Sequence, residues 1–156
     1  MFKIIAAAAL FILLFNTCTK PPIYNDIPEI KFARFSSDTV QQATGICTFV
    51  VSFTDGDGDL GADGNGIVNC FIIDDRRGDT IYYTIPKIPK QGVADAIAGE
   101  IEIDVAQICC INPDLPIACS AIANTYQQVT YSFIIQDNAG NFSNKAQSTG
   151  LNIKCF

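Results

Sequence analysis

The stretch from Cys47 to Phe53 reads Cys-Thr-Phe-Val-Val-Ser-Phe. Successive side chains of an extended chain point to opposite faces, so every second residue from Cys47 to Phe53 shares one face. That face is apolar throughout, whereas Thr48 and Ser52 lie on the other one. The alternation predicts a β-strand with one face in a hydrophobic core.

The same period of two recurs on both sides of this stretch. Clusters of Gly, Asp, Asn and Pro separate the apolar segments, and no long window after the N-terminal region carries a helical stripe. The pattern predicts an all-β fold, an antiparallel β-sandwich of about seven strands in a single domain. Besides 47–53, the expected strands cover about 30–33, 67–74, 80–85, 100–105, 129–135 and 145–153.

The N-terminus has the organisation of an export signal. Lys3 precedes twelve apolar residues, 4–15, which is the length of a signal-peptide core and well short of the ~20 residues that span a bilayer. Cys18 follows closely, and residues 19–29 contain three prolines and no periodic apolar pattern. These features predict a secreted chain with a short tether before its domain.

The segment around Cys18 resembles the lipobox of bacterial lipoproteins, in the relaxed form of Bacteroidetes-type lipoproteins, with Phe-Asn-Thr before the cysteine. The resemblance implies a signal peptide over residues 1–17, lipidation of Cys18, a tether over 18–29 and a domain over 30–156. An ordinary cleaved signal, in which Cys18 is incidental, is the alternative interpretation.

The chain has seven cysteines, and setting Cys18 aside leaves an even number. An even set in an exported domain predicts disulfides, although the sequence permits many pairings. A bond between the adjacent Cys109 and Cys110 is strained, so a bridge from one of them to Cys119, which closes a small loop, is favoured. The candidates are Cys47, Cys70, Cys109, Cys110, Cys119 and Cys155.

Composition excludes several classes of function. The chain has 16 acidic and 10 basic residues, a net charge of −6 and no histidine. Without histidine there is no Ser-His-Asp or Cys-His nucleophile system, and an acidic chain with few basic residues is a poor partner for nucleic acid. A protein that is not an enzyme is therefore expected.

One arrangement of carboxylates keeps an enzymatic alternative open. Glu100 and Glu102 lie on the same face of a predicted strand, roughly 6.5–7 Å apart, and the two carboxylates of a glycosidase are separated by about 5–9 Å. The simpler interpretation is the solvated face of a sheet.

The loop after Phe53 carries carboxylates at positions 1, 3, 5 and 9 of a glycine-rich segment. Hard oxygen ligands at this spacing suit Ca²⁺. Leu60 and Gly66 stand where an EF-hand requires Gly and Glu, so the loop is not an EF-hand. The four carboxylates are those of Asp55, Asp57, Asp59 and Asp63. A solvated acidic turn is the alternative.

Two segments carry a further family resemblance. Residues 53–61, Phe-Thr-Asp-Gly-Asp-Gly-Asp-Leu-Gly, resemble the acidic turn of many small Bacteroidetes-type lipoproteins. Residues 131–144, with the turn Asp-Asn-Ala-Gly-Asn-Phe-Ser, resemble the late hairpin of bacterial Ig-like and cadherin-like domains. The resemblance implies an Ig-like sandwich, in which these two loops emerge at the same end. Asp137 or Asn138 is thus expected to complete the calcium site, unless Asp137 is an ordinary turn residue.

Taken together, the sequence predicts a lipid-anchored, non-enzymatic Ig-like module for binding, adhesion or an accessory role. Its expected location is the bacterial cell envelope, as an outer-membrane lipoprotein on the periplasmic or surface side, with Ca²⁺ as a structural cofactor. Its expected partners are the membrane, through the lipid, and a protein or glycan ligand. The alternatives are a carbohydrate-recognition accessory lipoprotein of an uptake system and a small hydrolase that uses Glu100 and Glu102.

Overall fold

The computed structural model describes residues 22–64, 66–90, 95–112, 114–115, 119 and 125–155. The predicted signal peptide, residues 1–17, and the predicted lipidation site, Cys18, lie outside these residues. The described residues form β-strands and no helix, which confirms the predicted all-β fold. Within these ranges, accordingly, no helix has the length and apolar character needed to cross a membrane.

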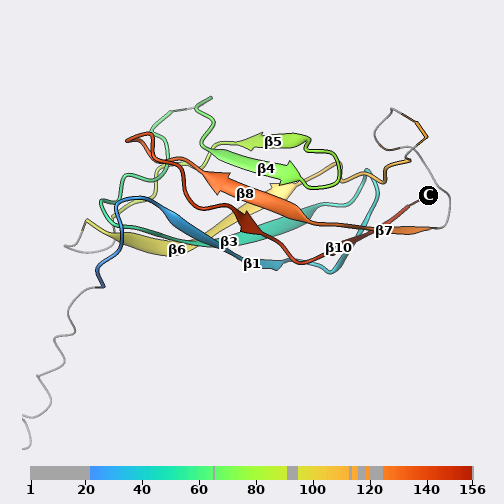
Figure 1. The fold of residues 1–156 in the computed structure, drawn as a ribbon, viewed down its shortest axis with the longest axis horizontal. Coiled ribbons are helices and arrows are strands. Elements are labelled where there is room, and N and C mark those ends of the chain that lie inside the picture. Colours follow the sequence, from blue (N-terminus) through green and yellow to red (C-terminus); the bar gives the residue numbers. More distant parts are fainter. Residues whose placement is uncertain are drawn as a thin grey trace, which may run out of the picture.

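The described residues contain ten strands in three sheets. The sheet β1-β3-β6 forms one layer, β5-β4-β8-β9 lies over it, and β2-β10-β7 lies at the end where the chain finishes (Figure 1). Neighbouring strands are antiparallel, except that β2 and β10 run parallel. The strands are β1 (Glu29–Phe35), β2 (Thr39–Gln41), β3 (Cys47–Asp55), β4 (Cys70–Asp74), β5 (Thr80–Tyr83), β6 (Ile97–Val105), β7 (Tyr126–Val129), β8 (Tyr131–Ile135), β9 (Ala146–Gln147) and β10 (Leu151–Lys154).

The predicted number of seven strands is wrong, because two predicted strands are each divided and β2 was not predicted. The division between β7 and β8 falls at Thr130, where the chain leaves the sheet of β10 and enters that of β4. The main-chain oxygen of Thr130 accepts a hydrogen bond from the Asp75 amide, and its hydroxyl donates to the Asp75 carboxylate. Apolar residues alternate without a break from Val129 to Ile135, so the sequence around Thr130 does not indicate that the chain changes sheets there.

The core forms where the inward faces of β3 and β8 meet. The ring centroid of Phe49 on β3 lies 4.8 Å from that of Tyr131 and 6.0 Å from that of Phe133, both on β8. Phe32 of β1 stacks on Phe133 at 5.9 Å. Truncating a buried Phe to Ala typically costs about 3–5 kcal/mol, so this contact between layers is a major source of stability. The predicted apolar face of residues 47–53 is buried as expected.

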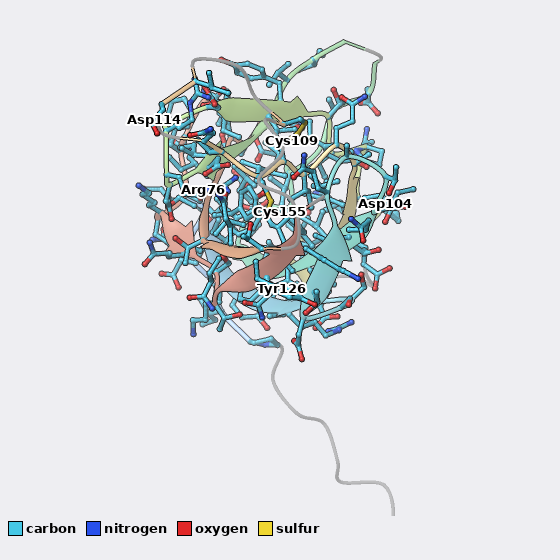
Figure 2. The ribbon with its side chains drawn as sticks, turned by 90° about the vertical axis from the view of Figure 1, so that its right-hand side faces the viewer. Arg76, Asp104, Cys109, Asp114, Tyr126 and Cys155 are labelled. Carbon is cyan, nitrogen blue, oxygen red and sulfur yellow. A yellow bond between two sulfur atoms is a disulfide. The ribbon has the colours of Figure 1, made fainter. Side chains whose placement is uncertain are left out.

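Disulfides fasten the end of the molecule at which the chain finishes. Cys109 is bonded to Cys119, the small loop that the sequence favoured, and Cys110 is bonded to Cys155. Figure 2 looks onto this end and shows Cys109 and Cys155 near its centre. The other two candidates, Cys47 and Cys70, are buried free thiols. Burial raises the pKa of Cys70 to about 12, so this thiol stays neutral.

Candidate metal centre

Two acidic side chains continue the inward-facing rows of the core strands. Asp55 follows Phe53 by two residues at the end of β3, and Asp137 follows Ile135 by two residues beyond β8. Because the side-chain period of a strand is two, both carboxylates keep the inward orientation of the apolar residues before them. Asp55 is 0% exposed and Asp137 only 6% exposed. The strand geometry therefore directs two carboxylates into the molecule, at the end where β8 finishes, which is on the left in Figure 1.

The loop after β3 gathers three carboxylates around the buried Asp55. One oxygen each from Asp55, Asp57 and Asp59 lies within 4.8 Å of the other two. Asp57 is exposed and Asp59 is partly buried, so the cluster reaches from the interior to the surface. This arrangement offers a cation negatively charged ligands and an open side toward solvent.

Two oxygens of this cluster are buried without a hydrogen-bond partner. The Oδ2 atom of Asp55 accepts a hydrogen bond from the Leu60 amide at 3.1 Å, but its Oδ1 atom accepts none. The Oδ1 atom of Asp59 is unpartnered as well. Buried polar atoms without partners are rare in folded proteins, because each one costs its full desolvation penalty. A cation bound at the cluster would supply the missing interaction for both atoms.

The pKa values of two aspartates in the cluster are raised, because the carboxylates are buried and lie close to one another. Burial raises the pKa of Asp55 to about 6, and repulsion from the Asp57 and Asp59 carboxylates adds to the effect. The pKa of Asp59 is also raised, first by burial and then by the carboxylates of Asp137 and Asp57. Main-chain hydrogen bonds, including the one from the Leu60 amide to Asp55, act in the opposite direction. Main-chain amides of the described residues therefore compensate the negative charge of this loop only in part.

Glycines allow the loop to fold back on its neighbours. Gly58 and Gly61 have φ angles of +68° and +94°, a region that residues with a Cβ rarely adopt. A Cβ atom at Gly58 would also collide with the main-chain oxygen of Asp95, just before β6. At Gly61 it would collide with that of Pro86. The glycines thus serve close main-chain packing as well as turn geometry.

The late turn, which begins at Asp137, contacts the acidic loop, so the two loops lie at the same end of the molecule. The Asn138 side-chain amide donates to the main-chain oxygens of Asp59 and Gly61, at 2.5 and 2.8 Å. Both carboxylate oxygens of Asp137 accept hydrogen bonds from Asn141, at 2.7 and 2.9 Å. Asp137 therefore lies beside the cluster and repels Asp59, but its oxygens are already engaged.

Asp63 stands apart from the three-carboxylate group. Its carboxylate pairs with the Lys87 ammonium at 2.7 Å, and both side chains are exposed. The structure thus brings Asp55, Asp57 and Asp59 together, with Asp137 as a neighbour. Sequence reasoning missed the full burial of Asp55, although extending the alternation of 47–53 by two residues would have indicated it.

The carboxylates of the enzymatic alternative have a different environment. The Arg34 guanidinium pairs with Glu100 at 2.9 Å and with Glu102 at 3.7 Å. Their side chains are 44% and 65% exposed, on the outer face of the sheet β1-β3-β6. This is the geometry of a solvated sheet face with a surface ion pair.

The site so described is a candidate cation-binding loop at one end of an all-β protein. No family model, curated protein or solved structure matches the chain.

Proposed function

We propose that the acidic loop binds a structural Ca²⁺ ion through Asp55, Asp57 and Asp59. The observation that carries the proposal is the Oδ1 atom of Asp55, a carboxylate oxygen that is fully buried, has no hydrogen-bond partner and lies within the cluster. Its burial follows from the strand, and its missing partner is what a bound cation would provide.

The donor set fits calcium in particular. Ca²⁺ takes 6–8 oxygen ligands in a flexible geometry, whereas Mg²⁺ demands a near-ideal octahedron. Three carboxylates supply part of such a shell, and the exposed position of Asp57 leaves room for water. Extracellular sites of this kind bind Ca²⁺ with a Kd of about 0.1–1 mM, so the ion would order the loop wherever free calcium exceeds that range.

A calcium titration of the protein and of two variants tests this proposal. Calorimetry should detect one ion per chain, and Ca²⁺ at ten times Kd should stabilise the fold by about 1.4 kcal/mol relative to chelator. Asp55→Asn should remove the binding signal. Asp63→Asn is the matched control, because Asp63 is a loop carboxylate outside the cluster, and its affinity should equal that of the parent. Absence of calcium binding by the parent would refute the proposal.

The wider function that we propose is a lipid-anchored, non-enzymatic Ig-like module of the bacterial envelope. Support for an Ig-like sandwich comes from the two stacked sheets and from the contact of Asn138 with the acidic loop at one end. Support for export comes from two disulfides, which persist in oxidising compartments. The anchor itself rests on the sequence around Cys18.

Mass spectrometry of the protein extracted from membranes tests the anchor. A mature chain that begins at Cys18 and carries acyl groups is the expected product, and Cys18→Ala should abolish acylation and membrane retention. An unmodified chain released into the soluble fraction would instead indicate an ordinary cleaved signal.

A second candidate function, carbohydrate recognition, is favoured by aromatic side chains on the sheet β5-β4-β8-β9. The ring centroid of Phe71 lies 6.0 Å from that of Tyr82 and 6.2 Å from that of Phe142. Tyr82 and Phe142 are more than half exposed. Binding to a glycan array that is lost in Phe71→Ala and Tyr82→Ala variants would support this candidate, and the same array with chelator would show whether calcium takes part.

A further inference from the structure

The N-terminal segment that leads into β1, residues 22–28, lies against the acidic loop. The amide of Gly56 donates a hydrogen bond to the main-chain oxygen of Asn25 at 2.7 Å. A Cβ atom at Gly56 would lie only 2.6 Å from the oxygen of Tyr24 and 2.8 Å from that of Asn25. The loop and the segment therefore touch main chain to main chain, at a position where only glycine fits.

This contact falls in the middle of the candidate site. Gly56 stands between Asp55 and Asp57, and the side chains of both neighbours are proposed calcium ligands. Fixing the two carboxylates around one ion fixes the peptide between them, and with it the direction of the Gly56 amide. Without the ion, repulsion among three carboxylates favours an opened loop.

Besides this contact, the segment is attached to the domain through Pro28, which is buried, and Tyr24, which is partly buried. Residues 22, 23, 25, 26 and 27 are exposed, and Ile23 is 98% exposed. A segment with so few buried contacts has low local stability. Its path along the domain consequently depends on the contact with Gly56.

We propose that the cation in the acidic loop acts as a latch, which holds residues 22–28 on the domain through the Gly56–Asn25 contact and releases them when it leaves. This inference rests on the calcium site proposed above. In the lipid-anchored protein, the latch would set the distance between membrane and domain. The chain from Cys18 to Asn25 spans at most about 24 Å, whereas the chain from Cys18 to Glu29 spans about 37 Å.

Cleavage by chymotrypsin after Tyr24 measures the release in the full membrane-extracted protein. Cleavage should be at least about tenfold slower in Ca²⁺ than in chelator, since a protease cuts an opened segment far faster than a docked one. A free peptide of residues 20–28 corrects for the effect of calcium on the protease. Hydrogen exchange of the Gly56 amide provides a second readout, and its protection should rise with calcium.

Two glycine substitutions test the latch. Gly56→Ala should make cleavage fast with and without calcium, because the added Cβ atom would collide with the main chain of Tyr24 and Asn25. Its calcium affinity should fall as well, because docking of the segment and binding of the ion are coupled. Gly64→Ala is the matched control in the same loop, since a Cβ atom there meets no atom within 4 Å, and it should behave like the parent.

The outcomes distinguish the two proposals. If the parent binds calcium but neither Tyr24 cleavage nor Gly56 exchange responds to it, the latch is refuted and the calcium site stands. If calorimetry detects no calcium binding, the site fails and the latch falls with it. The exchange measurement uses the parent protein, so the test remains decisive even where Gly56→Ala impairs folding.

Discussion

The two ends of the molecule are held together by different chemistry. At the end shown in Figure 2, disulfides join Cys109 to Cys119 and Cys110 to Cys155, and the Arg76 guanidinium donates to the main-chain oxygen of Cys109 at 3.0 Å. At the opposite end, the acidic loop is joined to its neighbours by main-chain contacts and carries two buried oxygens without partners. The first end is held by covalent bonds, and its one buried side-chain oxygen without a partner among the described residues is the neutral Oε1 atom of Gln42. The second end has two such oxygens, and both belong to carboxylates.

Asp75 and Asp55 show the difference within a single residue type. The Asp75 carboxylate accepts hydrogen bonds from the side chains of Thr130, Ser132 and Gln147, at 2.9, 2.7 and 2.9 Å. Burial alone would raise its pKa, but these hydrogen bonds reverse the effect and hold the pKa below its ordinary value. Asp55 has no side-chain donor among the described residues, and the main-chain amides of Leu60 and Asp59 do not outweigh burial, so its pKa is raised to about 6. A carboxylate with enough donors is stable as an anion, whereas a buried carboxylate with too few donors is stabilised either by a proton or by a cation.

The largest expected effect is at the covalent end. Replacing Cys110 and Cys155 by Ser should destabilise the fold by about 4 kcal/mol in urea denaturation, since the bridge closes a long loop. The same change at Cys109 and Cys119 should cost about 2.7 kcal/mol, because that loop is shorter. Calcium affinity should be unchanged in both variants. A loss of calcium binding would show that the two ends are coupled.

Asp75→Asn should have the next largest effect. Replacing the carboxylate by an amide removes the charge and leaves the part-buried hydroxyl donors of Thr130 and Ser132 with one acceptor oxygen to share. Because hydrogen bonds to charged groups are the stronger ones, the cost should be about 1–3 kcal/mol near neutral pH. Since the folded-state pKa is lowered, the stabilisation by Asp75 is present above its unfolded-state pKa and is lost as the pH falls through the folded-state value. The difference between parent and variant in urea titrations should therefore shrink in strong acid. An equal difference at every pH would contradict this account.

Asp55→Asn should produce a smaller effect whose sign depends on calcium. In chelator the variant should be at least as stable as the parent, because the amide carries no buried charge and its oxygen can still accept from Leu60. In calcium the variant should lack the gain of about 1.4 kcal/mol expected for the parent at ten times Kd. Thermal unfolding with and without calcium measures both values. A variant that is less stable by the same amount in both buffers would indicate a purely structural Asp55.

These sites differ in how far the sequence alone could specify them. The core strands follow from the alternation of residues such as Cys47 to Phe53, because burial of one face leaves a local pattern. The same alternation, extended by two residues beyond Phe53, predicts the burial of the Asp55 carboxylate. The changes of sheet at Thr130 and near Ser148 were not predictable in this way, since they depend on hydrogen bonds to Asp75 and Tyr131 from distant parts of the chain.

The spacing of the acidic residues predicted the metal ligands only in part, because contacts with distant parts of the chain also decide which carboxylates converge. Asp55, Asp57 and Asp59 share one loop, and their convergence follows from local geometry and intervening glycines. Asp63 was a candidate on spacing alone, but Lys87, a partner 24 residues away, pairs with it at the surface. Spacing along the chain shows which carboxylates are able to converge. Whether each one does so also depends on ion pairs with distant residues, such as that of Asp63 with Lys87.

Asp137→Asn should have the smallest effect, and it tests how far the late turn belongs to the site. Both Asp137 oxygens already accept hydrogen bonds from Asn141, so the residue acts on the cluster through its charge. Neutralising it should weaken calcium binding less than threefold in calorimetry, compared with the complete loss expected for Asp55→Asn. A loss as complete as that of Asp55→Asn would make Asp137 a direct ligand, and the ion would then bridge the two layers instead of ordering one loop.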